Sequence, residues 1–91
     1  MVRVLEPVAD KQPHLVAFGL RLKAKREAAG LSQAALGELV GLHRVSIARL
    51  EAGAWDVSLT MLRLLADALG TTTGELLEQP SPPPRSLGKR K

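Results

Sequence analysis

The stretch that decides the fold is residues 30–53, GLSQAALGELVGLHRVSIARLEAG. Ser32 is a favoured helix N-cap residue, and the apolar run behind it stops at Gly41 after about two helical turns. A second short helix is predicted from about His43 to Ala52, directly before another glycine, Gly53. The pattern therefore predicts two short helices separated by a tight turn.

Three more amphipathic segments flank this pair. One is predicted from about His14 to Ala29, and another starts at Ser58 and stops before Gly70. Thr72 and Glu75 have the spacing of a capping box, which predicts a short fifth turn. The residues predicted to face the core are Leu15, Phe18, Leu22, Leu36, Leu39, Val40, Ile47, Leu50, Leu59, Leu62, Leu65, Ala66, Leu69, Leu76 and Leu77.

The composition favours one small all-α domain. Hydrophobic residues make up 45% of the 91-residue chain but aromatic residues only 2%, so aliphatic side chains packed between helices must form the core. The absence of cysteine excludes disulfides, thiolate zinc sites and cysteine nucleophiles. No stretch approaches the roughly 20 apolar residues of a membrane span, and Met1 to Pro13 lacks a signal-peptide core. We therefore expect a cytoplasmic protein with no membrane partner.

The two ends of the chain differ from the middle. Residues 1–13, bounded by Pro7 and Pro13, show no sustained period and are expected to form a flexible N-terminal arm. Residues 79–91 hold four prolines followed by basic residues, and are expected to form a disordered tail because they have little to bury. The folded domain is therefore predicted to span residues 14–78.

The net charge of +4 and the pI near 10.1 support a nucleic-acid partner only weakly, because of where the charges lie. Basic residues exceed acidic ones from His14 to Gly53, acidic residues exceed basic ones from Ala54 to Glu78, and the two segments cancel. The net charge thus equals that of the tail. The basic half of the folded part is better support, since a basic face opposite an acidic one orients a protein on phosphate.

The two short helices within residues 30–53 match the helix-turn-helix geometry. In that geometry the second helix enters the major groove of DNA and the first lies across the backbone. Many helical hairpins share this spacing, so spacing and local charge leave DNA binding and a plain helical hairpin equally open.

Residues 18–78 resemble the phage repressor and Cro type, or XRE type, of helix-turn-helix domain. The most specific pieces are Gly30-Leu31-Ser32-Gln33, Val40-Gly41-Leu42, Ile47 with Leu50-Glu51 and Gly53, and Ala66 with Ala68-Leu69-Gly70. The resemblance implies a compact five-helix, lambda-repressor-like bundle that binds double-stranded DNA without a cofactor. It makes Ser32 to Leu39 the supporting helix and His43 to Ala52 the recognition helix.

The resemblance also implies which residues contact DNA. Such domains read bases from the exposed early positions of the recognition helix and one turn later, here Arg44, Val45, Ser46 and Arg49. Arg can make a bidentate contact to guanine, Ser can bond to several base edges, and Val can contact a thymine methyl. Gln33 matches a position that holds a phosphate at a helix N-terminus. The alternative is that Arg44 and Arg49 simply form the solvent-exposed face of an amphipathic helix and do not contact DNA.

Further roles are expected within the basic half of the chain. His43, Arg21 and Lys25 are expected to position phosphates. Arg26 and Glu51 match an ion pair that links the first helix to the recognition helix in the family, although an accidental surface pair gives the same pattern.

Several positions depart from the family pattern. His43 stands where a Ser or Thr N-cap is usual, and Gly37 replaces a common Ala at a cost of roughly 1 kcal/mol in helix propensity. Ala54 replaces a frequent basic residue and Val57 a common Pro, so the resemblance does not imply phosphate contacts from this loop. Trp55 is expected to pack on the bundle, to form a dimer contact or to lie near the DNA backbone.

Together these features predict a sequence-specific transcriptional regulator, a repressor that acts as a homodimer on an inverted-repeat operator. Leu69, Leu76 and Leu77 are expected to supply part of the dimer interface. The sequence shows no catalytic motif, and His14 and His43 have no acidic cluster at ligand spacing, so neither an enzyme nor a metal site is expected. The alternatives are an antitoxin that binds a toxin partner and represses its own operon, and the controller protein of a restriction-modification system.

Overall fold

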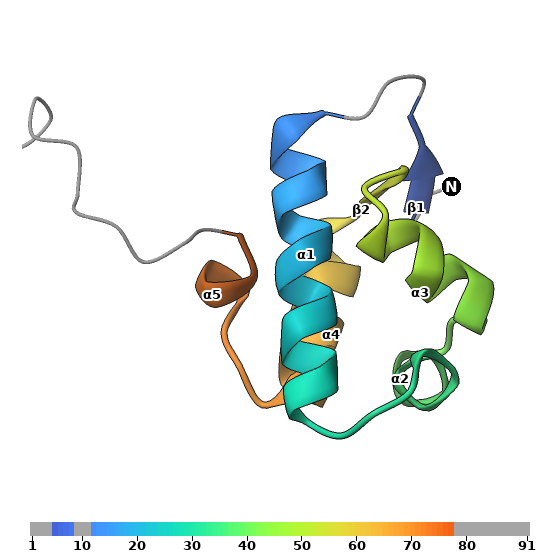
Figure 1. The fold of residues 1–91 in the computed structure, drawn as a ribbon, viewed down its shortest axis with the longest axis vertical. Helices are drawn as coiled ribbons and strands as arrows, with labels where there is room; N and C mark the ends of the chain where they lie inside the picture. Colours follow the sequence, from blue (N-terminus) through green and yellow to red (C-terminus); the bar gives the residue numbers. More distant parts are fainter. Residues whose placement is uncertain (1–4, 9–11, 78–91) are drawn as a thin grey trace, which may run out of the picture.

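The structure, a computed structural model, describes residues 5–8 and 12–77, so the expected tail at 79–91 lies outside the described residues. Five helices fill most of the described range (Figure 1). They are α1 (Pro13–Ala28), α2 (Gln33–Val40), α3 (Arg44–Glu51), α4 (Leu59–Leu69) and α5 (Thr73–Leu77). The five-helix prediction is confirmed, with helix ends close to the predicted ones.

Helices α2, α4 and α5 begin at a Ser or Thr whose side chain caps the N-terminus, whereas Gln12 before α1 makes no side-chain capping hydrogen bond. The Ser32 and Ser58 hydroxyls each accept a hydrogen bond from the backbone N–H three residues later, at 2.9 and 3.1 Å. The Thr72 hydroxyl accepts one from the backbone N–H of Glu75 in the same way, as the capping-box spacing predicted. Pro13 occupies the first turn of α1, where its missing N–H costs nothing.

A small antiparallel sheet joins the N-terminal segment to the loop after α3. Strand β1 (Leu5–Pro7) pairs with β2 (Trp55–Val57), with Leu5 opposite Val57 and Pro7 opposite Trp55. This corrects the expected flexible arm at residues 5–7, because ladder hydrogen bonds and packing of Leu5 against the core hold them in place. A three-residue strand is too short to give a recognisable alternation in the sequence.

The core lies between the helices, with α1 at the centre of the molecule. In Figure 1, α5 lies on one side of α1, α2 and α3 lie on the other, and α4 lies behind it. Leu39, Leu59 and Leu77 were predicted to face the core but are 61%, 79% and 49% exposed. Helix α2 buries only a narrow stripe, Leu59 is the first residue of α4, and Leu77 is the last residue of α5. The largest fully buried side chains are Leu22, Leu36, Ile47, Leu50, Leu65 and Leu76.

Candidate nucleic-acid interface

Helix α3 carries the residues predicted to read bases. Ile47 is fully buried and fixes which side of the helix faces the core. The Arg44 and Arg49 side chains are exposed, while Val45 and Ser46 are partly buried. The structure therefore brings the four predicted residues onto one short helix, with the two arginines as its most accessible members.

His43 caps the N-terminus of α3 in place of the usual Ser or Thr. Its Nδ1 atom accepts a hydrogen bond from the backbone N–H of Val45 at 3.1 Å. Because a ring nitrogen that accepts a hydrogen bond carries no proton, this contact requires the neutral ring with its hydrogen on Nε2. The imidazole thus serves as the cap and keeps one N–H donor, and a phosphate contact by that donor stays a prediction.

The turn between α2 and α3 packs directly against α2. The backbone N–H of Leu42 donates to the Gly37 carbonyl at 2.8 Å, and a Cβ atom at Gly37 would overlap the Leu42 carbonyl oxygen. This close approach explains why glycine stands where alanine is common. Gly37 therefore lets the turn that leads into α3 sit directly against α2.

The loop after α3 fixes the other end of the helix. Gly53 is buried with a φ of 76°, and a Cβ atom there would lie 3.0 Å from the backbone of Val16 in α1. The backbone N–H of Ala54 donates to the Arg49 carbonyl at 3.0 Å. Trp55 then packs against the core, and its ring centroid lies 5.3 Å from the Arg49 guanidinium carbon.

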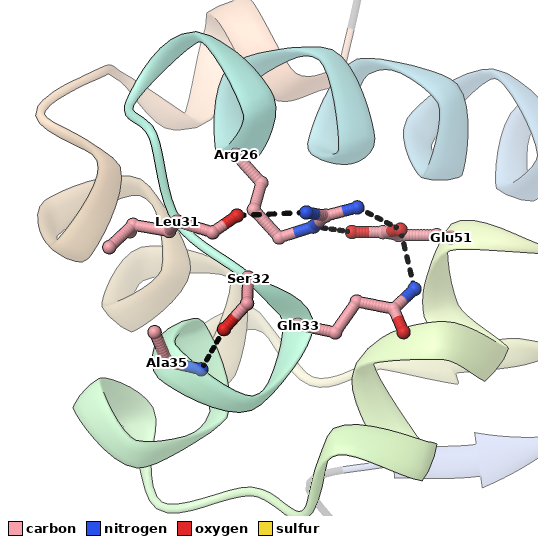
Figure 2. Close-up of polar contacts among 6 residues, drawn as sticks. All are labelled: Arg26, Leu31, Ser32, Gln33, Ala35 and Glu51. Atoms are coloured by element: carbon pink, nitrogen blue, oxygen red, sulfur yellow. Dashed lines mark hydrogen bonds and ion pairs between the residues drawn. The ribbon is translucent and has the colours of Figure 1, made fainter.

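A buried ion pair ties α3 to α1 (Figure 2). Arg26 donates from Nε and Nη2 to the two carboxylate oxygens of Glu51, at 2.6 and 3.1 Å, and from Nη1 to the Leu31 carbonyl at 2.8 Å. The two side chains are only 10% and 5% exposed. The hydrogen bond with Glu51 raises the pKa of Arg26 above its ordinary value, against the opposing effect of desolvation. The structure thus contains the expected pair, in a buried and bidentate form.

Gln33, the first residue of α2, belongs to the same network. Its Nε2 atom donates to a carboxylate oxygen of Glu51 at 3.0 Å, so one carboxylate links α1, α2 and α3 (Figure 2). We call Arg26, Gln33, Glu51 and the Leu31 carbonyl the Arg26 network. An amide NH2 group has two donors, which leaves the second N–H of Gln33 for another acceptor. Phosphate binding by Gln33 stays a prediction.

Two other residues expected to hold phosphates contact α5 instead. Arg21 donates to the Leu77 carbonyl at 2.9 Å, and the Lys25 ammonium lies 3.2 Å from a carboxylate oxygen of Glu75. Hydrogen bonds from Thr71 first, and then from Lys25, lower the pKa of Glu75 below its ordinary value. Helix α5 lies across α1 from α3 (Figure 1). Arg21 and Lys25 therefore brace α5 and do not flank the recognition helix.

The residues expected at a dimer interface differ in exposure. Leu76 is fully buried in the core, which corrects the expectation that it contacts a second subunit. Its role is to anchor α5 to the bundle. Leu77 is 49% exposed and Leu69 is partly buried, so these two can still contribute.

Within residues 5–8 and 12–77, no group of three or more His, Asp and Glu side chains could hold a metal ion. None of the helices that the structure describes is long and apolar enough to cross a membrane.

Comparison with known proteins identifies the family. The family model described as "Helix-turn-helix domain" matches residues 17–79. None of the curated proteins matches the chain. Among solved structures, the restriction-modification controller protein C.AhdI from Aeromonas hydrophila is 45% identical, with 68% of this chain and 94% of that chain covered and a TM-score of 0.66. The clp gene regulator ClgR from C. glutamicum is 26% identical, with 77% and 90% covered and a TM-score of 0.70.

A third similar structure belongs to an enzyme. The hydroxypropylphosphonic acid epoxidase from S. wedmorenis is 32% identical over 71% of this chain, with a TM-score of 0.67, but this chain spans only 35% of it. That likeness therefore concerns one part of the epoxidase. The family model, by contrast, covers α2 to α5 and all but the first four residues of α1. The chain belongs to the helix-turn-helix domain family and is a DNA-binding transcriptional regulator.

Proposed function

We propose that this regulator is a repressor that binds an inverted-repeat operator as a homodimer, with α3 in the major groove. The observation that carries the proposal is the outer side of α3, where Arg44 and Arg49 are exposed on a helix that is held at both ends. A helix in the major groove presents its early residues, and those one turn later, to base edges. A compact domain over an operator blocks polymerase sterically, so it needs neither catalysis nor a cofactor.

Base and phosphate contacts divide between different parts of the site. In the proposal, Arg44 and Arg49 read guanine, with Val45 and Ser46 beside them on α3. The Nε2–H of His43 and the second amide N–H of Gln33 hold phosphates, because both residues lie at the start of a helix.

A dimer is part of the proposal because one such domain contacts only a few base pairs. Two half-sites about one helical turn apart, roughly 34–36 Å, supply the missing specificity. Leu77 and Leu69 are proposed to belong to the interface, since both retain exposed surface.

The identity of 45% with C.AhdI supports a second candidate, the controller protein of a restriction-modification system. A restriction or methyltransferase gene beside this one would support that candidate. A toxin gene, with stoichiometric capture of its product, would instead favour the antitoxin role.

The proposal is tested by selecting bound sequences from a random DNA pool. We expect an inverted repeat, bound by two protein chains in sedimentation experiments. A lone half-site bound at full affinity by a monomer would contradict the dimer. Equal binding to the selected and a scrambled duplex would contradict sequence-specific recognition.

A further inference from the structure

The Arg49–Trp55 contact joins a residue on the outer side of α3 to the small sheet. The Arg49 guanidinium carbon lies 5.3 Å from the Trp55 ring centroid, within the roughly 6 Å over which a cation is attracted to an aromatic face. Arg49 is exposed, and a long exposed side chain without such a contact samples many rotamers. The ring therefore restricts where the guanidinium lies.

Several contacts hold the Trp55 ring itself. It packs against the core cluster, and the residue opposite it in the sheet is Pro7 of β1. The preceding residue, Ala54, donates its N–H to the Arg49 carbonyl at 3.0 Å and accepts a hydrogen bond from the Val8 N–H at 3.1 Å. These contacts hold the ring close to the backbone of α3, and β1 pairs with the strand that carries the ring.

A ring suits this task better than an acidic side chain would. A carboxylate takes up N–H donors of the guanidinium, as Glu51 does with two donors of Arg26. An aromatic face attracts the cation but occupies none of its donors, so the donor pair that recognises guanine stays available.

We propose that Trp55 is a positioning residue for base recognition, which holds the Arg49 guanidinium in the orientation that it uses on DNA. This inference rests on the proposed function, in which Arg49 reads a base. Restricting the side chain before binding reduces the freedom lost on binding, so the contact strengthens the operator complex and sharpens base preference at one position.

The test compares Trp55→Leu, which removes the aromatic face, with Trp55→Phe, which keeps a smaller one. Val57→Ala is the matched control, since Val57 is another partly buried residue of β2 that packs against the core. Each variant is measured on the selected duplex, and on duplexes changed at single base pairs, at one salt concentration. Circular dichroism during chemical denaturation monitors folding stability.

We expect Trp55→Leu to weaken operator binding by about two- to fivefold, as expected for loss of an exposed cation–π contact. Preference should relax at the same base pair that Arg49→Ala affects, Trp55→Phe should be intermediate, and Val57→Ala should leave preference unchanged. In an Arg49→Ala background, Trp55→Leu should have no further effect on binding.

A second measurement needs no DNA. The Arg49 side-chain protons should show an upfield ring-current shift in the NMR spectrum of the free protein, and Trp55→Leu should abolish that shift. A normal shift in the unmodified protein would overturn the proposal.

Other results would also overturn it. One is that Trp55→Leu lowers the affinity for the operator by the same factor whether residue 49 is Arg or Ala. Another is that Trp55→Leu binds the operator more tightly, which would mean that the ring holds Arg49 away from DNA. If Arg49→Ala leaves base preference unchanged, the proposal falls but sequence-specific regulation stands. If the random pool yields no enriched sequence, the proposed function fails and this inference fails with it.

Discussion

Arg26 and Glu51 face each other as a bidentate pair, with donor–acceptor distances of 2.6 and 3.1 Å, inside the junction of three helices. Arg26 belongs to α1, Glu51 is the last residue of α3, and Gln33 brings in α2. The pair therefore sets how the recognition helix sits on the rest of the domain. In the described part of the chain, no buried side-chain nitrogen or oxygen lacks a hydrogen-bond partner.

Removing one member of this pair should destabilise the fold strongly. We expect Glu51→Ala to lower the free energy of unfolding by about 3–5 kcal/mol, because it leaves the Arg26 guanidinium buried and unpaired. Replacing both residues, as in Arg26→Met with Glu51→Leu, should lower the free energy of unfolding less than Glu51→Ala does. Chemical denaturation of Arg26→Met, of Glu51→Leu and of the variant with both substitutions measures the coupling between the two residues.

An exposed pair provides the control for that cycle. The Nε atom of Arg63 lies 3.4 Å from the Oδ1 atom of Asp67 on α4, and the two side chains are 73% and 62% exposed. Their coupling energy should be only about 0.3–0.5 kcal/mol. A coupling for Arg26 and Glu51 as small as this would mean that the network does not organise the domain.

Much of the bundle could be predicted from the sequence because its signals are local. Ser32, Ser58 and Thr72 sit at the cap positions that their spacing indicates, since a cap needs only the next three residues. The Arg26–Glu51 pair was different, because periodicity says nothing about residues 25 positions apart, and only the family resemblance indicated it.

Two substitutions of His43 distinguish its role as the N-cap of α3 from its proposed contact with DNA. His43→Ser keeps a cap on α3 and should leave stability nearly unchanged, whereas His43→Ala should lower the free energy of unfolding by about 1 kcal/mol. Both variants lose the Nε2–H donor, so both should weaken binding to operator and scrambled DNA by similar factors. Base-specific loss in His43→Ser would show instead that the ring reads a base.

Leu76 and Leu77 should respond differently although they are neighbours. Leu76→Ala removes a fully buried side chain and should lower the free energy of unfolding by about 2–5 kcal/mol. Leu77→Lys should leave the monomer folded but raise the dimer dissociation constant, because it places a charge in the proposed interface. Sedimentation equilibrium, with thermal unfolding in parallel, distinguishes the two effects. A Leu77→Lys protein that dimerises normally would remove Leu77 from the interface.

Acid should loosen the contact between α1 and α5. The folded-state pKa of Glu75 is lowered by Thr71 and Lys25, so the carboxylate stabilises the fold above its unfolded-state pKa. This stability is lost as the pH falls through the folded-state pKa. As the pH falls through the folded-state pKa of Glu75, the free energy of unfolding of the Glu75→Gln variant should therefore decrease less than that of the unmodified protein. The effect should be small and screened by salt, since the group is exposed, and identical acid titrations of the two proteins would contradict it.

The parts that sequence reasoning missed depend on contacts between distant segments. Strand β1 lies about 50 residues from β2, and a three-residue strand carries no period of its own. The exposure of Leu39 and the engagement of Arg21 with α5 follow from how the helices pack, which helical spacing does not determine. For the same reason, the contact of Arg49 with Trp55 had no local signal beyond the two residue types.

Substitutions of Arg44, Arg49 and Gln33 test whether the two arginines contact bases while Gln33 contacts a phosphate. Replacing either arginine with Ala should cost about 1–3 kcal/mol on the selected operator and relax preference at particular base pairs, because each loses a bidentate contact. Gln33→Ala should weaken binding to operator and scrambled DNA more evenly. Because Gln33 also donates a hydrogen bond to Glu51, the free energy of unfolding of the Gln33→Ala variant is measured as well. Only binding by the folded protein is then compared.

Loss of affinity does not decide this prediction, because an arginine also attracts phosphate. The deciding comparison measures each variant on both duplexes at one salt concentration, and then measures the dependence of affinity on salt. A pure phosphate contact lowers the slope of log affinity against log salt by about 0.9 and affects both duplexes alike. If Arg44→Ala and Arg49→Ala both behave in that way, the arginines of α3 are electrostatic contacts, and base recognition lies elsewhere on the domain.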